Sequence, residues 1–484
     1  MKTKKIEVTA CTIFCWAIFT VHVTAQAVIY PFPQGVESSK AYKVLVNNRD
    51  VFVYDAPVAP ITSFDMAGPV VIEIQADRDI KWVDIRPRNL GIKPEFKDST
   101  IRFKLEKPCN ISIELNGEYS NKPLYLFANP SEKNRPTKGT KGVHFFEAGK
   151  VYTPGIIEVK SGETVYIEGG AVVYGMIHAE NASGIRIAGR GILEGTHNKE
   201  YQKGRWRRFI EMKDCRNLQI EGITLINSPT WQIVPINCEY VTISNVRLIS
   251  NNGGDDGIDV VRSRKVNIEN CFIHTKDDCI AIKSAWDYPG HIGSEDITVT
   301  RSVFWNTEWG NALEIGFELR ADTMKNITFR DCDVIHCDDG AVFSIHNGDR
   351  AVVTNVTFED IRVEDARQKL FDLAIFFSQY SVDAPRDRTS KEFVYQNGPW
   401  DGLVHLPAHK KKEHAQYRGQ IRNVTFKNIQ VVDGIFPFSV FCGYDEDHVI
   451  ENVVIENLTV HGKKINTFSD ARLYTEFAKN IHLK

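Results

Sequence analysis

The stretch NLQIEGITLINSPTWQIVPINCEYVTISNVRLISNNGGDDGIDVVRSRKVNIENCFIHTKDDCIAIK (residues 217–283) decides the fold. Within it, three phrases alternate apolar and polar residues: NLQIEGI (217–223), YVTISNV (240–246) and KVNIENC (265–271). Such alternation is typical of a β-strand with one buried face. One short strand cannot bury that face alone, but strands stacked in successive coils bury it together. The repeat therefore predicts a solenoid of short strands.

The same phrase recurs along most of the chain, with its first apolar residue advancing by 20, 33, 23, 25, 31, 30, 29, 68 and 29 residues. A period of about 20–30 residues built from strands and turns is typical of a β-solenoid. We therefore predict an all-β chain with a right-handed parallel β-helix over residues 143–484. A second sandwich is the competing interpretation, and sparse hairpin signals weigh against it. The repeated apolar positions are Val165, Ile185, Leu218, Val241, Val266, Ile297, Ile327, Val356, Val424 and Val453.

The step of 68 residues is too long for one coil. We expect it to hold a further coil plus an insertion at about residues 382–418, either a groove wall or lid or a solvated excursion. Three Asn-x-Ser/Thr triplets occupy the same place in successive phrases, and we interpret their asparagines as turn residues that stack between coils. These are Asn326, Asn355 and Asn423.

Three segments precede the predicted β-helix. Residues 1–27 resemble a secretory signal, with a basic start, an apolar stretch too short to span a bilayer and small residues at the end. Residues 28–128 contain short β-branched runs such as PVVIEIQ (69–75), which predict a small β-sandwich. Residues 129–142 are polar and predict a linker. These features indicate a periplasmic or extracellular protein without a membrane span.

The composition excludes several classes of protein. The 484 residues are 42% hydrophobic and 25% charged, which are globular values, and the formal net charge of -3 argues against a nucleic-acid partner. Eight cysteines lie outside the signal, without the CxxC spacing of a zinc site. We expect mostly free, buried thiols and neither a metal nor another cofactor. The oligomeric state stays open.

Acidic pairs recur at one point of successive coils, in GGDDGIDV (253–260), KDDCIAIK (276–283), WGNALEIG (309–316) and CDDGAVFS (337–344). Equivalent positions of neighbouring coils lie about 4.8 Å apart. Clustered carboxylates raise one another's pKa, so that one stays protonated as an acid while another acts as a base. This is the equipment for cleaving a glycosidic bond. A calcium site or a set of acidic turns is the alternative. The paired positions are Asp255-Asp256, Asp277-Asp278, Gly310-Asn311 and Asp338-Asp339.

The chain resembles glycoside hydrolase family 28, the polygalacturonases, over about residues 140–480. The matching phrases are GRGILEG (189–195), NSPTWQIVPINCEYVTI (227–243), GDDGIDV (254–260) and KDDCIAIKS (276–284). The resemblance implies an inverting hydrolase of a polysaccharide or oligosaccharide that needs no cofactor. It further implies that Asp277 is the general acid and that Asp256 and Asp278 activate the water.

Two family phrases are changed. The family's Gly-His-Gly is Gly310-Asn311-Ala312 here, and its carboxylate-binding Arg-Ile-Lys falls near Ser344-Ile345-His346. The sugar, the linkage and endo or exo action therefore stay open. The order of sandwich and β-helix, with AGRGILEG (188–195) and FELRADTMKNITFRDCDVIH (317–336), also resembles the family 49 dextranases of the same clan.

Further residues near the acidic pairs are candidates for binding the glycan. The tryptophans would stack on sugar rings, although packing aromatics look the same in sequence. His346 is the candidate replacement for the missing Arg-Ile-Lys. The predicted substrate-binding residues are Asn311, Lys283, His346, Asp339, Trp231, Trp309 and Glu314.

Two other functions remain open. Many polysaccharide lyases are β-helices, but they use calcium and a basic residue, whereas this stripe is rich in carboxylates and has few bases. A non-catalytic glycan-binding β-helix would bind sugar tightly without turnover. The acidic pairs favour hydrolysis over both.

Overall fold

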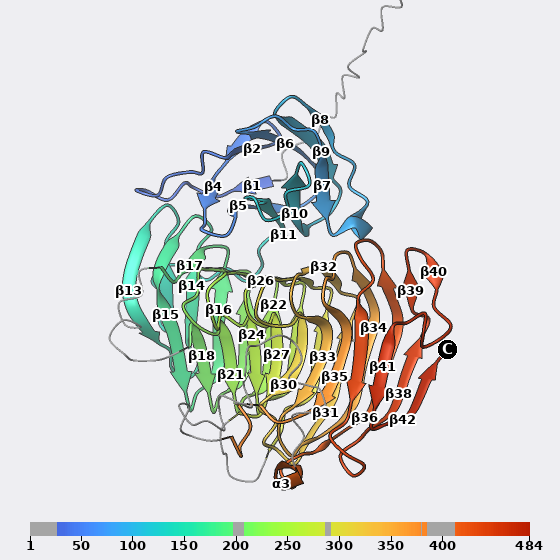
Figure 1. Ribbon diagram of the computed structural model, residues 1–484. Coiled ribbons are helices and arrows are strands. Elements are labelled where there is room, and N and C mark those ends of the chain that lie inside the picture. The colour runs from blue at the N-terminus through green and yellow to red at the C-terminus, as the bar shows by residue number, and fades with distance from the viewer. Residues whose placement is uncertain (1–26, 197–207, 286–291, 379, 385–411) are drawn as a thin grey trace, which may run out of the picture.

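The computed structural model describes residues 27–196, 208–285, 292–378, 380–384 and 412–484. Two domains follow one another along the chain, a small β-sandwich above a long parallel β-helix (Figure 1). The predicted signal, apart from Ala27, and most of the predicted insertion lie outside the described residues. Among the described residues, no helix is both long and apolar enough to cross a membrane.

The predicted sandwich forms from two sheets that pack through their apolar faces. Alternation along β6, whose even-numbered side chains are buried, places Val70, Ile72 and Ile74 in the shared core. One sheet holds β1 (Ala27–Ile29), β4 (Val53–Asp55), β5 (Pro60–Met66), β7 (Val83–Arg86), β10 (Cys109–Leu115) and β11 (Leu124–Pro130). The other holds β2 (Tyr42–Val46), β3 (Arg49–Val51), β6 (Val70–Ala76), β8 (Glu95–Lys97) and β9 (Thr100–Leu105). A short 3-10 helix, η1 (Arg88–Leu90), follows β7.

The repeated phrases form one parallel ladder of the β-helix, here called the repeat ladder. Val241 pairs with Val266, which pairs with Ile297, and this register continues through the later coils. The predicted apolar positions are thus in register, except that Val165 pairs with Ile187 instead of Ile185. The ladder holds β12 (Val143–Phe146), β14 (Thr164–Ile167), β16 (Ser183–Gly189), β19 (Arg216–Glu221), β22 (Glu239–Ser244), β25 (Arg264–Glu269), β28 (Glu295–Thr300), β31 (Thr323–Arg330), β34 (Val352–Val363), β36 (Gln420–Val431), β38 (Ile450–Glu456) and β42 (Ala478–Leu483).

A second ladder, the site ladder, carries alternating side chains inward to the core and outward to the candidate site. It holds β18 (Ile210–Lys213), β21 (Ile233–Ile236), β24 (Ile258–Val261), β27 (Ile280–Lys283), β30 (Leu313–Phe317), β33 (Ala341–Asn347), β35 (Lys369–Ile375), β37 (Phe438–Cys442) and β41 (Leu473–Glu476). A third, the interface ladder, faces the sandwich and holds β17 (Ile192–Glu194), β20 (Thr224–Ile226), β23 (Arg247–Ile249), β26 (Phe272–Thr275), β29 (Val303–Asn306) and β32 (Asp333–Cys337). The remaining elements are β13 (Val151–Glu158), β15 (Val172–Glu180), β39 (Thr459–Val460), β40 (Lys463–Lys464) and α3 (Lys412–Ala415).

The expectation of a further coil within the long step is wrong. β34 pairs directly with β36, so that Val356 lies beside Val424. The 68 residues between them therefore make a single coil that passes through β35 and carries the insertion.

Polar stacking occurs at the turns, as expected. Asn326, Asn355 and Asn423 all have positive φ values of 56–58°. Asn355 donates to Asn326 (3.3 Å), and Asn423 donates to Thr354 of the preceding coil (3.1 Å). The eight cysteines in the described chain are free, and all but Cys109 are buried, so the prediction of free thiols is confirmed.

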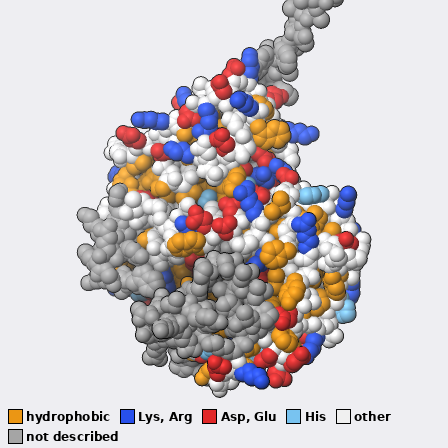
Figure 2. All heavy atoms as spheres, viewed as in Figure 1, with side chains coloured by type: hydrophobic (Ala, Val, Ile, Leu, Met, Phe, Trp, Pro, Cys, Tyr) orange, Lys and Arg blue, Asp and Glu red, His pale blue; other side chains and the backbone are white. Residues whose placement is uncertain are grey.

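The two domains share an apolar interface. Tyr125 and Phe127 of the sandwich pack against Phe272 of the interface ladder, with ring centroids 4.9 and 5.3 Å apart. Because aromatic side chains bury large areas, this contact fixes the sandwich on the β-helix. Figure 2 shows basic and acidic side chains interspersed over the side in view, outside its grey atoms, without a large patch of one sign.

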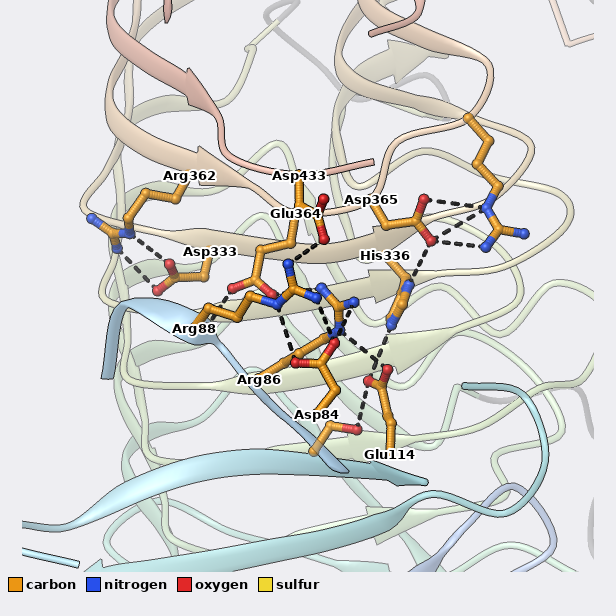
Figure 3. Close-up of polar contacts among 12 residues, drawn as sticks. Asp84, Arg86, Arg88, Glu114, Asp333, His336, Arg362, Glu364, Asp365 and Asp433 are labelled. Carbon is orange, nitrogen blue, oxygen red and sulfur yellow. Dashed lines mark hydrogen bonds and ion pairs between the residues drawn. The ribbon is translucent and has the colours of Figure 1, made fainter. Parts of the chain in front are cut away.

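Ion pairs extend the interface (Figure 3). Arg86 of β7 is buried and pairs with Glu114 (3.1 Å) in the sandwich and with Glu364 (2.7 Å) in the β-helix. His336 of β32 lies between Glu114 (3.1 Å) and Asp365 (2.9 Å). Burial raises the pKa of Glu364 to about 7, although Arg86 opposes this. Removing one partner from such a network leaves an uncompensated buried charge.

Candidate functional site

Three aspartates meet at the start of the site ladder. Ile258 pairs with Ile280, which puts Asp256 level with Asp278 in the next coil. One carboxylate oxygen from each of Asp256, Asp277 and Asp278 lies within 4.8 Å of the others. Asp256 and Asp278 are buried and Asp277 is partly exposed. The structure thus brings the predicted catalytic residues together, and we call them the aspartate cluster.

The neighbouring Asp255 holds the turns in place. It is fully buried and its carboxylate accepts backbone N–H groups of Asn252 (2.8 Å), Lys276 (3.0 Å) and Asp277 (3.0 Å). Burial raises its pKa to about 6. Because its oxygens bind the backbone of both turns, Asp255 supports the backbone from which Asp277 projects.

Burial and mutual repulsion set the charge of the cluster. Burial, followed by the charge of Asp256, raises the pKa of Asp277 to about 8. The same causes, with Asp277 added, raise the pKa of Asp278 well above its ordinary value. A carboxyl group with such a pKa remains protonated at neutral pH and has a proton to donate.

Lys283 compensates the negative charge. Its ammonium lies 2.8 Å from Asp256 and 3.0 Å from Asp259, and the side chain is buried. The two carboxylates raise its pKa well above the ordinary value, although burial acts the other way. The predicted Lys283 is therefore at the site, as a partner of the cluster, while Asp259 was not predicted. Asp259 follows the alternation of GIDV, which points it outward on β24 beside Asp256.

The two predicted tryptophans have different surroundings. Trp231 is partly buried between two cations, with the Lys283 ammonium 3.9 Å and the Arg208 guanidinium 3.8 Å from its ring. Trp309 is 56% exposed and lies beside Lys276, whose ammonium is 4.5 Å from the ring. Trp309 therefore offers an exposed face for a sugar ring, whereas Trp231 packs against the lysine of the cluster.

A chain of buried polar side chains leads away from Asp278. Asn311 donates from its backbone (2.7 Å) and its side chain (3.3 Å) to Asp278 Oδ1, and its side chain also donates to Glu314 (3.1 Å). Glu314 lies 3.1 Å from Nδ1 of His346, whose Nε2 lies 3.1 Å from Asp372. We call Asn311, Glu314, His346 and Asp372 the polar relay.

The relay defines what occupies the place of the family's Arg-Ile-Lys. Burial lowers the pKa of His346, but Glu314 and Asp372 outweigh it and raise that pKa to about 9. His346 is thus an imidazolium between two carboxylates. Lys369 also pairs with Asp372. Asp372 and Lys369 were not predicted, although the alternation in KLFDLAI (369–375) points both outward from the core.

The expected alignment of Asp338-Asp339 with the other acidic pairs is wrong. Leu313 pairs with Phe343, which puts Asn311 level with Ala341. The Ala341 N–H accordingly donates to the Asn311 side chain (2.9 Å). Asp339 lies two residues earlier and is exposed, so the structure does not bring it to the aspartate cluster.

Among the described residues, the aspartate cluster is the group of side chains whose geometry suits a metal ion. The Lys283 ammonium already lies 2.8 Å from one of its carboxylates. This positive charge opposes the entry of a second cation by electrostatic repulsion.

Comparison with known proteins agrees with this geometry. The model of glycosyl hydrolases family 28 matches residues 141–371, which include the aspartate cluster. A probable polygalacturonase of Arabidopsis thaliana is 28% identical over 211 residues, which cover 43% of this chain and 44% of that protein. A probable endopolygalacturonase D of Aspergillus niger is 25% identical over 273 residues, covering 52% and 46%. The chain is a β-helix protein of the glycoside hydrolase family 28 type.

The structural comparison extends to both domains of this family 28-like protein. Dex49A from Penicillium minioluteum superposes with a TM-score of 0.63 at 15% identity, covering 92% of this chain and 95% of that chain. This likeness confirms the fold and the predicted similarity to family 49. The chain spans less than half the length of the curated relatives named above.

Proposed function

We propose that this protein is an exported glycoside hydrolase that cleaves a polysaccharide or oligosaccharide without a cofactor. The observation that carries the proposal is the aspartate cluster, in which Asp277 has a pKa of about 8 and Asp256 is paired with Lys283. Export rests on the sequence of residues 1–27.

In this proposal Asp277 protonates the leaving glycosidic oxygen. It is the partly exposed member of the cluster, so it is the carboxyl group that a glycan reaches. Asp256, whose charge Lys283 stabilises, takes the proton of the attacking water, and Asp278 helps to hold that water. The two bonds from Asn311 fix the Asp278 carboxylate. General acid and base catalysis of this kind contributes about 10²–10⁴-fold for each group.

The stereochemistry is a separate part of the proposal. The family resemblance implies inversion. The carboxylate oxygens lie within 4.8 Å, nearer to the roughly 5–5.5 Å between carboxyl groups of retaining enzymes than to the 6.5–9.5 Å of inverting ones. Proton NMR of the first product, recorded before mutarotation, decides the matter: inversion gives the anomer opposite to that of the cleaved bond.

The substrate is proposed at the level of its class. The relatives named as polygalacturonases favour a pectic glycan. However, Ser344 and His346 stand where the family has arginine and lysine, and His346 lies between two carboxylates. A bidentate arginine is the usual partner of a sugar carboxylate. The panel must therefore contain neutral as well as anionic glycans.

The test is release of reducing sugar from polygalacturonate, rhamnogalacturonan, dextran, pullulan and sulfated galactans. We compare wild type with Asp277→Asn and with Asp447→Asn, a matched control at an exposed turn. Release that disappears only in Asp277→Asn supports the proposal and identifies the glycan. A product that absorbs as an unsaturated uronide would show a lyase instead. Sugar binding without turnover by wild type would show a binding protein.

A further inference from the structure

A cavity lies where the sandwich meets the β-helix, next to the turns of the aspartate cluster. Its volume is about 340 Å³, within the range of pockets that hold small ligands. Tyr119 and Ser120 line it from the sandwich, and Asn251, Asn252 and Thr307 line it from the β-helix. The wall that the sandwich provides has no counterpart in the β-helix itself.

The cavity and the aspartate cluster share two turns of the chain. The Asn252 N–H donates to Asp255 (2.8 Å), and Asp256 follows in the same turn. Four residues of chain span at most about 14 Å, which limits the separation between Asn252 and Asp256. In the next coil, Thr307 lies two residues before the exposed Trp309. A glycan that reaches the aspartates over Trp309 is therefore within a few sugar units of the cavity.

The lining suits sugar hydroxyl groups. Asn251 accepts a hydrogen bond from Thr307 (2.8 Å), and Asn252 donates to Asn227 (3.0 Å), so amides and hydroxyls are held in fixed positions. Amide side chains both donate and accept, as a sugar hydroxyl requires. Aromatic side chains complete the wall, with Tyr119 on one side and Trp305 on the other.

Two buried polar atoms of the lining residues also lack partners. Trp305 Nε1 and His274 Nε2 have no hydrogen-bond partner within the described parts of the chain. The other ring nitrogen of His274 is bonded to Tyr125. Since buried polar groups are nearly always hydrogen-bonded, these atoms are consistent with a polar occupant of the cavity.

The charge of the lining opposes an acidic sugar. Asp338 is the one carboxylate among the lining residues. Arg367 lies 3.8 Å from Asp338, but it is held more closely by Asp365 at 2.9 Å. The positive charge near the cavity is thus already balanced, and a uronate would meet the Asp338 carboxylate.

We propose that this cavity is a distal subsite that binds an uncharged sugar unit of the same glycan that is cleaved at the aspartates. The sandwich would then select the substrate by forming one wall of its binding site. The proposal rests on the proposed function only in that one glycan chain occupies both places.

The test is calorimetric binding of gluco-, galacto- and galacturono-oligosaccharides of two to eight units to the Asp277→Asn protein, with and without Ser120→Trp. Ser120 is exposed at the cavity, so tryptophan there fills it. The matched control is Ser131→Trp, an exposed linker serine outside the cavity. We expect Ser120→Trp to weaken binding of long neutral chains about tenfold or more, and to leave the shortest chains and the control unchanged. A second variant, Thr307→Val, removes a hydroxyl without adding bulk and should weaken the same long chains.

Three outcomes overturn the subsite: equal affinity of Ser120→Trp and its parent at every length, equal loss for short and long chains, or preferential binding of galacturonate chains that Ser120→Trp abolishes. Failure of the proposed function looks different. Wild type would then bind long neutral chains in a manner sensitive to Ser120→Trp but cleave none of them.

Discussion

Replacement of Asp277 by asparagine is expected to remove turnover and at the same time to stabilise the folded protein. Asp277 has a pKa of about 8 in the folded protein against an ordinary value of 3.8, because burial and Asp256 oppose its ionisation. One pKa unit corresponds to about 1.4 kcal/mol. At pH 7 the unfolded state therefore gains stability relative to the folded state by losing this proton, at a cost to folding of up to about 4 kcal/mol.

The sign of the pH dependence follows from the raised pKa. Below about pH 4, Asp277 is protonated in both states and contributes nothing. As the pH rises from about 4 to 8, only the unfolded state loses the proton, so wild type becomes progressively less stable than Asp277→Asn. The expected difference in the free energy of unfolding is near zero at pH 4 and about 2–4 kcal/mol at pH 7 and above.

Urea denaturation of both proteins at pH 4, 5.5, 7 and 8.5 measures this difference. The asparagine can still accept the Asp278 N–H that Asp277 accepts at 3.1 Å, so the turn is preserved. The exposed control Asp447→Asn should show no comparable trend. A difference that is constant with pH, or an Asp277→Asn protein that is less stable than wild type at pH 8.5, would refute the reasoning.

Three further predictions concern other parts of the molecule. Arg86→Met should lower the free energy of unfolding by about 3–5 kcal/mol, because it leaves Glu364 buried without its partner, whereas Lys104→Met, at an exposed ion pair, should cost at most about 1 kcal/mol; denaturation curves of both compare them. His346→Gln should be less stable than wild type at pH 7, and this difference should shrink as pH rises through about 9, where wild-type His346 loses its raised-pKa proton; an unchanging difference would argue against the imidazolium. Trp309→Ala should raise KM about threefold to tenfold with little change in kcat, as loss of a stacking face predicts; an unchanged KM would exclude that role.

The fold was largely predictable because its signal is local and repeated. Each phrase of the repeat ladder carries its own alternation, and one register then aligns Val241, Val266 and Ile297. The long step misled because length alone does not distinguish an extra coil from an insertion between two ladders. Only the direct pairing of Val356 with Val424 shows that the coil is single.

The site was predictable where coil length preserves register and not elsewhere. Asp256 and Asp278 precede paired strands at equal distances, so the sequence alone aligns them. Asp339 is shifted by two residues because its turn has a different length, which the repeated motif conceals.

Contacts between domains were not predictable. Arg86 and Glu364 are 278 residues apart, and no local pattern connects them. The same is true of the cavity, whose two walls come from different domains. Such contacts depend on how the sandwich sits on the β-helix, which the periodicity of either domain does not specify.

The pH dependence of kcat/KM, measured on the glycan that wild type cleaves, tests the central claim most directly. If Asp277 donates its proton to the leaving oxygen, activity should fall above about pH 8, where that proton is lost. Asp277→Asn should be at least about 10³-fold less active throughout the pH range. Activity that continues to rise above pH 8, or an Asp277→Asn protein that retains most of its turnover, would contradict the account.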